Sequence, residues 1–226
     1  MINIRYYIIH CKQHTDRTFY VDVIKEWLGK PSEIFYGIYT KYVSLPRQLD
    51  FLHIFNRDFK FDDPSKFKFY LPGQIGCYLS HFKLLEKILT DKNNNLYVDD
   101  YSVIFEDDVT FDSGLHNQIE EIINNLKENC IDFDLIYLGN NSKNYGEHIV
   151  NNIYKVNPLR NCWGTHALLI NNKNIEKLYY STLNIKHEID SQYKLNICDN
   201  IINGLVVYPS ICGQKGEWFK SHIKEK

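Results

Sequence analysis

Short apolar runs alternate with amphipathic segments along most of this chain. Six runs are suited to buried strands: residues 4–9, 34–39, 102–105, 134–138, 166–170 and 205–208. Strands that alternate with helices predict an α/β fold around a mostly parallel sheet with helices on its faces. Because no internal repeat, linker or hinge composition interrupts the 226 residues, we expect a single domain over residues 1–226.

The clearest helical pattern covers residues 73–89. Its apolar side chains recur every three or four positions and form one face: Ile75, Tyr78, Leu79, Phe82, Leu85, Ile88 and Leu89. Other helices are expected from a cap at residue 15 or 16 to residue 28, and over 115–126 and 175–180. Residues 46–70 have no clear period, which predicts loops with short helices there.

Three acids, Glu106, Asp107 and Asp108, follow directly on the apolar run 102–105. Their mutual repulsion raises their pKa values unless a cation or hydrogen-bond donors compensate. Mg²⁺ and Mn²⁺ bind one or two carboxylates together with substrate phosphates. In open α/β sheets ligands lie beyond the carboxyl ends of strands, so this cluster is the predicted site. A solvated turn that caps a helix near Ser113, or a nuclease or phosphatase metal site, would contain the same acids.

Strand geometry divides these acids further. Alternation along an extended chain points Glu106 and Asp108 to one side and Asp107 to the other. We therefore expect Glu106 and Asp108 to converge on a metal–diphosphate site, while Asp107 points to another part of the ligand or to a backbone donor.

Charge and composition exclude several classes of function. The formal net charge is −2 with acids and bases intermixed, which gives no electrostatic case for binding nucleic acid or an anionic membrane. No run approaches the roughly 18 apolar residues of a transmembrane segment, and Arg5 interrupts the first run. We therefore expect no signal peptide, and a protein that is cytoplasmic or acts in the compartment where its parent gene product is placed. The six cysteines show neither CxxC nor zinc-ligand spacing, so no disulfide scaffold is expected.

Several further segments carry motifs. Residues 7–10 (YIIH) precede the pair Asp16 and Arg17, residues 72–81 read PGQIGCYLSH, and residues 104–109 read IFEDDV. Later segments complete the set: 134–139 (DLIYLG), 163–170 (WGTHALLI), 189–190 (ID) and 208–223, which opens with YPS and ends with SHI. In this order they resemble glycosyltransferase family 25, which contains lipooligosaccharide sugar transferases and procollagen galactosyltransferases.

The chain departs from the family's pattern at three positions. Gln74 stands where the family's "GEIGCxLSH" segment has Glu, and His10 stands where Asn is common. His222 stands where the closing "SDI" stretch has Asp.

The resemblance implies a GT-A type, Rossmann-like fold that binds a nucleotide-sugar with Mn²⁺ or Mg²⁺ and inverts the anomeric centre. The implied donor is a UDP-hexose, of galactose or glucose. The implied acceptor is a hydroxyl of a saccharide or of hydroxylysine in a collagen-like protein. The compact length is similar to bacterial and viral members. A non-catalytic glycan- or nucleotide-binding module with this fold and a metal-dependent phosphoesterase are the alternatives.

Site roles carried over by the resemblance fall into three groups. Asp108 and Glu106 are the expected metal ligands, joined by His222 from the C-terminal tail. Asp190 is the expected base for the acceptor hydroxyl, and Asp107 is expected to hydrogen-bond the donor sugar. The remaining contacts to the nucleotide-sugar are expected from Arg17, Gln74, Ser80, His81, Gly164 and Thr165.

Several of these residues have plainer interpretations. Asp190 lies at the start of an expected helix and would serve as its N-cap. The guanidinium of Arg17 suits a phosphate but would also hold the first loop by an ion pair. His81 would be a buried histidine with satisfied hydrogen bonds, and Gly164 and Thr165 a turn before a strand.

Overall fold

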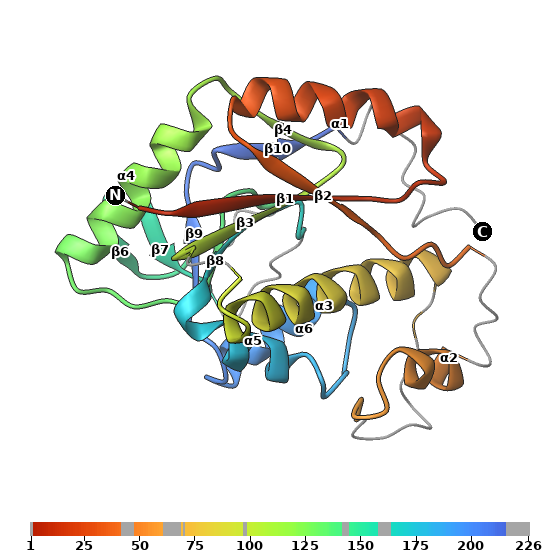
Figure 1. Ribbon diagram of the computed structural model, residues 1–226. Helices are drawn as coiled ribbons and strands as arrows, with labels where there is room; N and C mark the ends of the chain where they lie inside the picture. The colour runs from red at the N-terminus through yellow and green to blue at the C-terminus, as the bar shows by residue number, and fades with distance from the viewer. Residues whose placement is uncertain are drawn as a thin grey trace.

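A computed structural model describes residues 2–41, 48–60, 69, 71–96, 99–141, 145–157 and 164–215. Within these residues the centre of the fold is an eight-stranded sheet in the order β2-β1-β3-β8-β5-β9-β7-β6. Figure 1 shows helices on both of its sides. No helix in the described part of the chain is long and apolar enough to cross a membrane.

Strand directions confirm the predicted α/β class with a mostly parallel sheet. The strands of the sheet are β1 (Ile4–His10), β2 (Ser32–Tyr36), β3 (Tyr101–Glu106), β5 (Leu135–Tyr137), β6 (His148–Val150), β7 (Ile153–Lys155), β8 (Ala167–Asn171) and β9 (Gly204–Val207). β8 and β7 each run antiparallel to both of their neighbours, whereas β1 is parallel to β2 and β3, and β5 is parallel to β9. The other six strands of the described sheet therefore point the same way.

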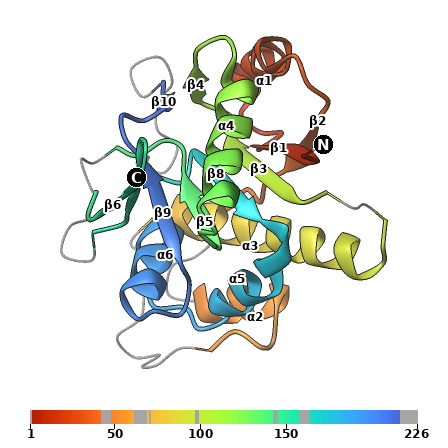
Figure 2. The same ribbon diagram turned by 90° about the vertical axis from the view of Figure 1, so that its left-hand side faces the viewer.

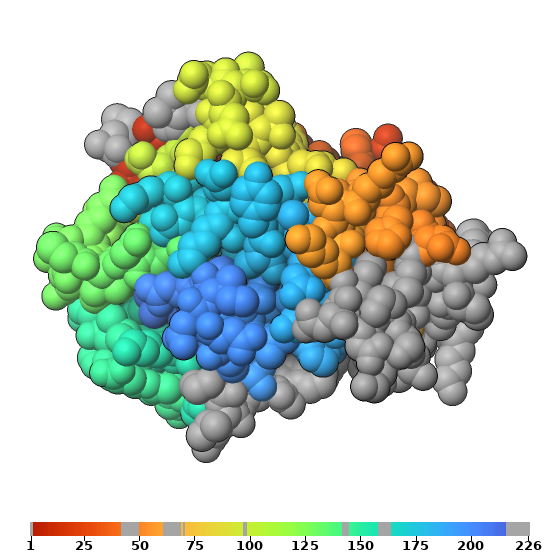
Figure 3. Space-filling view, turned by 90° about the horizontal axis from the view of Figure 1, so that it is seen from below, coloured from red at the N-terminus to blue at the C-terminus, as the bar shows by residue number. Residues whose placement is uncertain are grey.

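Helices cover both faces of the sheet. They are α1 (Thr15–Leu28), α2 (Gln48–Phe55), α3 (Pro72–Asn93), α4 (Leu115–Glu128), α5 (Ile175–Ser181) and α6 (Ile189–Cys198). α1 and α4 lie on one side, and α3, α5 and α6 on the other, as two perpendicular views show (Figures 1 and 2). Seen from below, the second group of helices and α2 together form the surface over the sheet (Figure 3).

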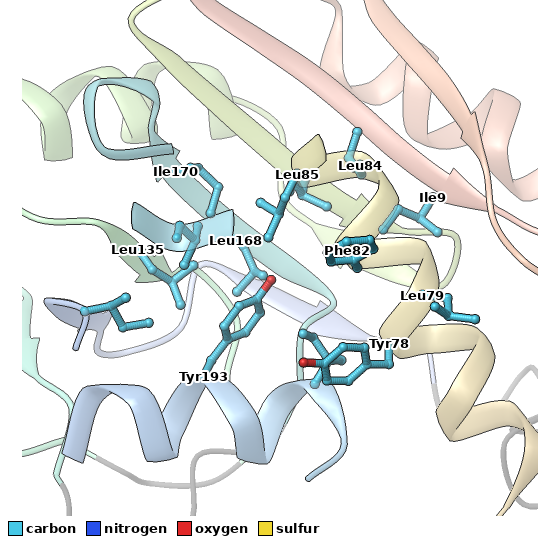
Figure 4. Close-up of a cluster of buried hydrophobic side chains, with 14 of the residues drawn as sticks. Ile9, Tyr78, Leu79, Phe82, Leu84, Leu85, Leu135, Leu168, Ile170 and Tyr193 are labelled. Carbon is cyan, nitrogen blue, oxygen red and sulfur yellow. The ribbon is translucent and has the colours of Figure 1, made fainter. Parts of the chain in front are cut away.

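Alternating side chains of the central strands form two hydrophobic clusters. In β1, Tyr6 and Ile8 pack with the α1 and α4 side chains, while Tyr7 and Ile9 pack with those of α3. Figure 4 shows the second cluster, where α3 faces Leu168 of β8. This alternation is what a sheet buried on both faces requires, and it anchors the strand ends that carry the acids.

The two best helix predictions agree with the structure. The buried residues of α4 are the predicted ones: Leu115, Ile119, Ile122, Ile123 and Leu126. α3 extends from Pro72 to Asn93, four residues beyond its predicted end. α1 ends at Leu28 as predicted, and Gly29 follows it with a left-handed φ of 61°.

Gly76 explains why α3 can approach the loop after β2 closely. A Cβ at this position would lie 2.6 Å from the carbonyl oxygen of Ile38 and 2.6 Å from Thr40 Oγ1. Such distances are shorter than van der Waals contact, so only glycine fits without a shift of the backbone. The first turns of α3 are thereby held against the loop that follows β2, with Cys77 and His81 of this helix beside Glu106 at the end of β3.

Some elements differ from the sequence-based expectation. β2 ends at Tyr36 rather than residue 39. The short pairs β6 with β7, and β4 (Val109–Phe111) with β10 (Cys212–Gln214), were not predicted. α2 supports the short helix expected within residues 46–70, although residues 46, 47, 61–68 and 70 of that segment lie outside the described part.

Candidate functional site

The candidate site lies where several strand and helix ends meet. β1 and β3 are parallel neighbours, so their carboxyl ends, at His10 and Glu106, lie side by side. β8 is antiparallel to β3, which brings the chain just before its start to the same edge, and Glu106 N–H donates to the carbonyl oxygen of His166 (3.0 Å). α3 approaches this edge from one face of the sheet and α1 from the other (Figure 1).

Glu106, the last residue of β3, faces α3. Its Oε1 accepts hydrogen bonds from Thr165 Oγ1 (2.6 Å) and from His81 Nε2 (3.1 Å). The Cys77 thiol lies 3.9 Å from the same oxygen. Burial alone would raise the pKa of Glu106, but the hydrogen bonds and charge of His81, together with the Thr165 hydroxyl, lower it to about 2. Glu106 is therefore held as a carboxylate.

Asp107 faces the opposite side of the sheet and is 5% exposed. Its Oδ1 accepts a hydrogen bond from Arg17 Nη1 (2.6 Å), and its Oδ2 lies 2.8 Å from His10 Nδ1. The other ring nitrogen of His10 lies 3.3 Å from Thr18 Oγ1. Both oxygens of Asp107 are thus engaged by side chains from β1 and α1.

Asp108 is also buried, and its carboxylate has three contacts. Arg17 Nη1 lies 3.3 Å from Oδ2, and Gln214 Nε2 lies 3.2 Å from each of the two oxygens. Gln214 is held in turn, because its Oε1 accepts a hydrogen bond from Asn141 Nδ2 (2.9 Å). The pKa of Asp108 is raised to about 6, first by burial and then by the negative charge of Glu106.

The described part of this site has an excess of negative charge. It contains four carboxyl groups, those of residues 106–108 and of Asp190, and one permanent cation, Arg17. Burial would lower the pKa of Arg17, but Asp107 and Asp108 raise it, so the guanidinium stays charged. One guanidinium balances only one carboxylate, and a divalent cation beside Asp108 would balance two of the remaining three. These residues therefore fit a divalent ion.

Asp190 reaches the site from the first turn of α6. Its Oδ1 accepts a hydrogen bond from Ser191 N–H (2.7 Å), and its Oδ2 from Gly164 N–H (3.4 Å). Glu188 occupies the N-cap position of α6, so the N-cap interpretation of Asp190 is wrong. Burial is the main cause of a raised pKa at Asp190.

The expected alternation of the three acids ends at Glu106, because residues 107 and 108 form a turn. Asp107 and Asp108 share Arg17, whereas Glu106 contacts α3 and Thr165. The solvated-turn interpretation is also wrong, since Asp107 and Asp108 are 5% and 7% exposed. The cap of the next helix is Gly114.

Other predicted site residues have contacts that organise α3. Gln74 Oε1 accepts a hydrogen bond from Leu71 N–H (3.1 Å), which caps the first turn of the helix. Ser80 Oγ accepts from Ile38 N–H (2.8 Å) and donates to the carbonyl oxygen of Gly76 (2.6 Å). Their expected contacts to a nucleotide-sugar stay predictions. His222, the third expected metal ligand, lies outside the described residues.

Four residues at the site had no predicted role: His10, Cys77, Asn141 and Gln214. His10, Cys77 and Gln214 stand within segments that carry the family resemblance, so their position in those segments was an available signal. Gly164, with a φ of 101°, fits the predicted turn before β8.

Comparisons with known proteins agree on one family. A family model described as "Glycosyltransferase family 25 (LPS biosynthesis protein)" matches residues 3–193. The chain is 31% identical over 90 residues to a "Probable inactive glycosyltransferase 25 family member 3" of Bos taurus. The aligned stretch is 40% of this chain and 14% of that protein. It is 36% identical over 67 residues to "Procollagen galactosyltransferase 1-A" of Xenopus laevis, covering 30% of this chain and 10% of that protein.

A relative from Drosophila melanogaster, "Glycosyltransferase 25 family member", is 26% identical over 135 residues, 60% of this chain and 21% of that protein. The chain thus spans a small part of the length of these relatives. Among solved structures, apo-form glycosyltransferase GlyE of Streptococcus pneumoniae TIGR4 aligns with a TM-score of 0.40 at 11% identity, over 96% of this chain and 46% of that one.

Proposed function

This chain belongs to glycosyltransferase family 25, and we propose that it catalyses the metal-dependent, inverting transfer of a hexose from a UDP-sugar to a hydroxyl acceptor. One observation carries the proposal: Asp107 and Asp108 are buried beside the partly exposed Glu106 at the end of β3, and the permanent cation that contacts them is Arg17. A divalent ion would neutralise part of the negative charge of this site, and the bound ion would then attract the diphosphate of a nucleotide-sugar.

Asp108 and Glu106 would hold the ion, Mn²⁺ or Mg²⁺. When bound, the ion would neutralise the charge that develops on the departing diphosphate. The burial of Asp108 and its pKa of about 6 support this assignment, because an adjacent cation would favour its ionised form. Thr165 and His81 would keep the Glu106 carboxylate in one orientation, which lowers the cost of assembling the site.

Asp190 is the proposed base that takes the proton from the acceptor hydroxyl. Its raised pKa supports this role, since a base is most effective when its pKa lies nearer the working pH. The N–H of Gly164 would fix one of its oxygens. An inverting displacement requires this carboxylate on the face of the sugar opposite the diphosphate.

Asp107 and Arg17 are proposed to form the second half of the donor site. In the free protein the guanidinium is shared between Asp107 and Asp108. A bound diphosphate offers oxygens in the fork geometry that arginine recognises, so Arg17 would also contact the phosphates. Asp107 is proposed to accept hydrogen bonds from the sugar hydroxyls. We also propose that the donor carries galactose or glucose and that the acceptor is a saccharide or a collagen-like protein. The family and the name of the Xenopus relative suggest both proposals.

A non-catalytic sugar-nucleotide-binding module is the alternative. The name of the bovine relative, which calls that protein probably inactive, favours it. The two functions differ in turnover, because a binding module holds the donor without releasing UDP.

Release of UDP from a panel of UDP-sugars tests the proposal. We expect release with one or two of the sugars, in Mn²⁺ or Mg²⁺ and not in chelator, and loss of release in Asp108→Ala. Asp22→Ala, which changes an exposed acid on α1, is the matched control and should keep the wild-type rate. Metal-dependent binding without release would favour the binding module. No metal-dependent binding of any UDP-sugar would refute both.

A further inference from the structure

Three side chains beside the acidic cluster bring together a sulfur, a nitrogen and an oxygen. Cys77 and His81 stand four residues apart on α3, so both project from the same face of the helix. Glu106 reaches them from the end of β3. The Cys77 sulfur, the His81 ring nitrogen and the Glu106 carboxylate oxygen all lie within 4.8 Å of one another.

These separations are close to those around a tetrahedral zinc ion. Zinc bonds of about 2.0–2.3 Å place neighbouring ligand atoms roughly 3.3–3.7 Å apart. His81 Nε2 lies 3.1 Å and the Cys77 sulfur 3.9 Å from Glu106 Oε1. Side-chain shifts of well under 1 Å would therefore bring these two pairs to zinc-ligand separations, and the third pair, the Cys77 sulfur and the His81 ring nitrogen, lies within 4.8 Å.

The types of ligand decide which ion fits. Mg²⁺ and Mn²⁺ prefer oxygen ligands, whereas a thiolate with an imidazole and one carboxylate favours Zn²⁺ and its chemical relatives. We propose that Cys77, His81 and Glu106 form a second cation site, selective for Zn²⁺-class ions and distinct from the oxygen site at Asp108. Three protein ligands leave a fourth position of the ion open to water or another ligand.

Solvent reaches the proposed site, and a bound ion would counter the burial that raises the pKa of the Cys77 thiol. The Glu106 side chain is 20% exposed, so solvent reaches the ligand cluster. His81 Nδ1 is buried, and within the described part of the chain it makes no hydrogen bond that would prevent it from carrying the ring proton. On binding, the Cys77 thiol releases its proton to solvent as the sulfur–metal bond forms. The His81 ring then carries a single proton, on Nδ1, and the lone pair on Nε2 binds the ion; a ring that starts out charged releases its second proton to solvent.

The sharing of Glu106 links the two sites. An ion held by Cys77 and His81 would take the Glu106 carboxylate away from the proposed donor ion. The second site would thus let Zn²⁺ oppose an activity that Mn²⁺ or Mg²⁺ supports.

Cobalt(II) is a direct probe, because a thiolate bound to it gives a sulfur-to-metal charge-transfer absorption. We expect one equivalent of Co²⁺ to produce this absorption in wild type and Zn²⁺ to displace it. Cys77→Ser should abolish it, and His81→Gln should weaken Co²⁺ binding at least about tenfold. Cys11→Ser is the matched control, since Cys11 lies in the same charged environment but outside the ligand set, and should keep the absorption. No absorption in wild type, or its persistence in Cys77→Ser, would overturn the proposal.

A measurement on the unaltered protein guards against a variant that fails to fold. Zn²⁺ should protect Cys77, and not Cys11, from alkylation by iodoacetamide, as peptide mapping of each cysteine would show. Equal alkylation of Cys77 with and without Zn²⁺ would refute the site. Neither readout requires sugar transfer, so this proposal and the proposed function can fail separately.

Discussion

Replacing Thr165 with valine removes one hydroxyl and leaves the volume of the side chain nearly unchanged. This hydroxyl donates to Glu106 Oε1 over 2.6 Å, and Thr165 is 4% exposed, so water cannot replace it freely. A hydrogen bond to a charged group contributes about 1.5–3 kcal/mol. We therefore expect Thr165→Val to lower the free energy of unfolding by about that amount at pH 7.

The sign of the pH dependence follows from Glu106. Its pKa is lowered to about 2 in the folded protein, from an ordinary value of 4.5. The stabilisation of its ionised form is fully present above the ordinary pKa and is lost as the pH falls through the folded value. Because the Thr165 hydroxyl supports that ionised form, the difference between wild type and Thr165→Val should shrink between pH 5 and pH 2.

Urea unfolding at a series of pH values measures both effects. Thr90→Val is the matched control, because that hydroxyl donates to a backbone carbonyl on the exposed side of α3. Its cost should stay within about 0.5 kcal/mol and be independent of pH. In a Glu106→Gln background, Thr165→Val should cost only about 0.5–1.5 kcal/mol, as for a neutral hydrogen bond. A cost for Thr165→Val that matches Thr90→Val, or that is the same at pH 7 and pH 3, would refute the reasoning.

Four further outcomes are expected. Asp190→Asn should lower kcat about 10²–10⁴-fold without weakening the binding of the UDP-sugar. In a pH–rate profile of the wild type, kcat should rise with pH through a pKa above that of an ordinary aspartate. Gly76→Ala should cost about 1–3 kcal/mol in thermal or urea unfolding, because its Cβ would press on a backbone carbonyl. Gln214→Leu should leave Asp108 without its amide donor and weaken Mn²⁺-dependent UDP binding, measured by calorimetry, more than it weakens folding. Zn²⁺ should inhibit Mn²⁺-dependent UDP release in wild type, and Cys77→Ser should relieve most of that inhibition in the same assay.

Long elements with a strong period could be predicted from the sequence. The apolar face of α4 was predicted residue by residue, because a periodicity of three and four repeats over four turns. The strand that ends at Glu106 was equally clear, since a run of apolar residues ends abruptly in three acids. The rule that ligands lie at the carboxyl ends of strands then predicted the site without coordinates.

Short elements and long-range contacts could not be predicted in this way. β4 and β10 contain three residues each, too few to show a period of two, yet their pairing brings Gln214 to Asp108 across 106 positions. The orientation of Asp108 could not be predicted from the sequence either, because the alternation of side chains along β3 ends where residues 107 and 108 form a turn. A cysteine pattern could not reveal the proposed second cation site, since only Cys77 takes part in it.

Calorimetric binding of UDP and UMP, with Mn²⁺ and with chelator, to wild type and Asp108→Asn tests the central claim most directly. If Asp108 holds an ion against the diphosphate, UDP should bind tightly to the wild type and only with Mn²⁺. The same arrangement also predicts weak, Mn²⁺-independent binding of UMP, and loss of the Mn²⁺ dependence in Asp108→Asn. Binding of UDP that is equal with Mn²⁺ and with chelator, or equal in the two proteins, would contradict the account.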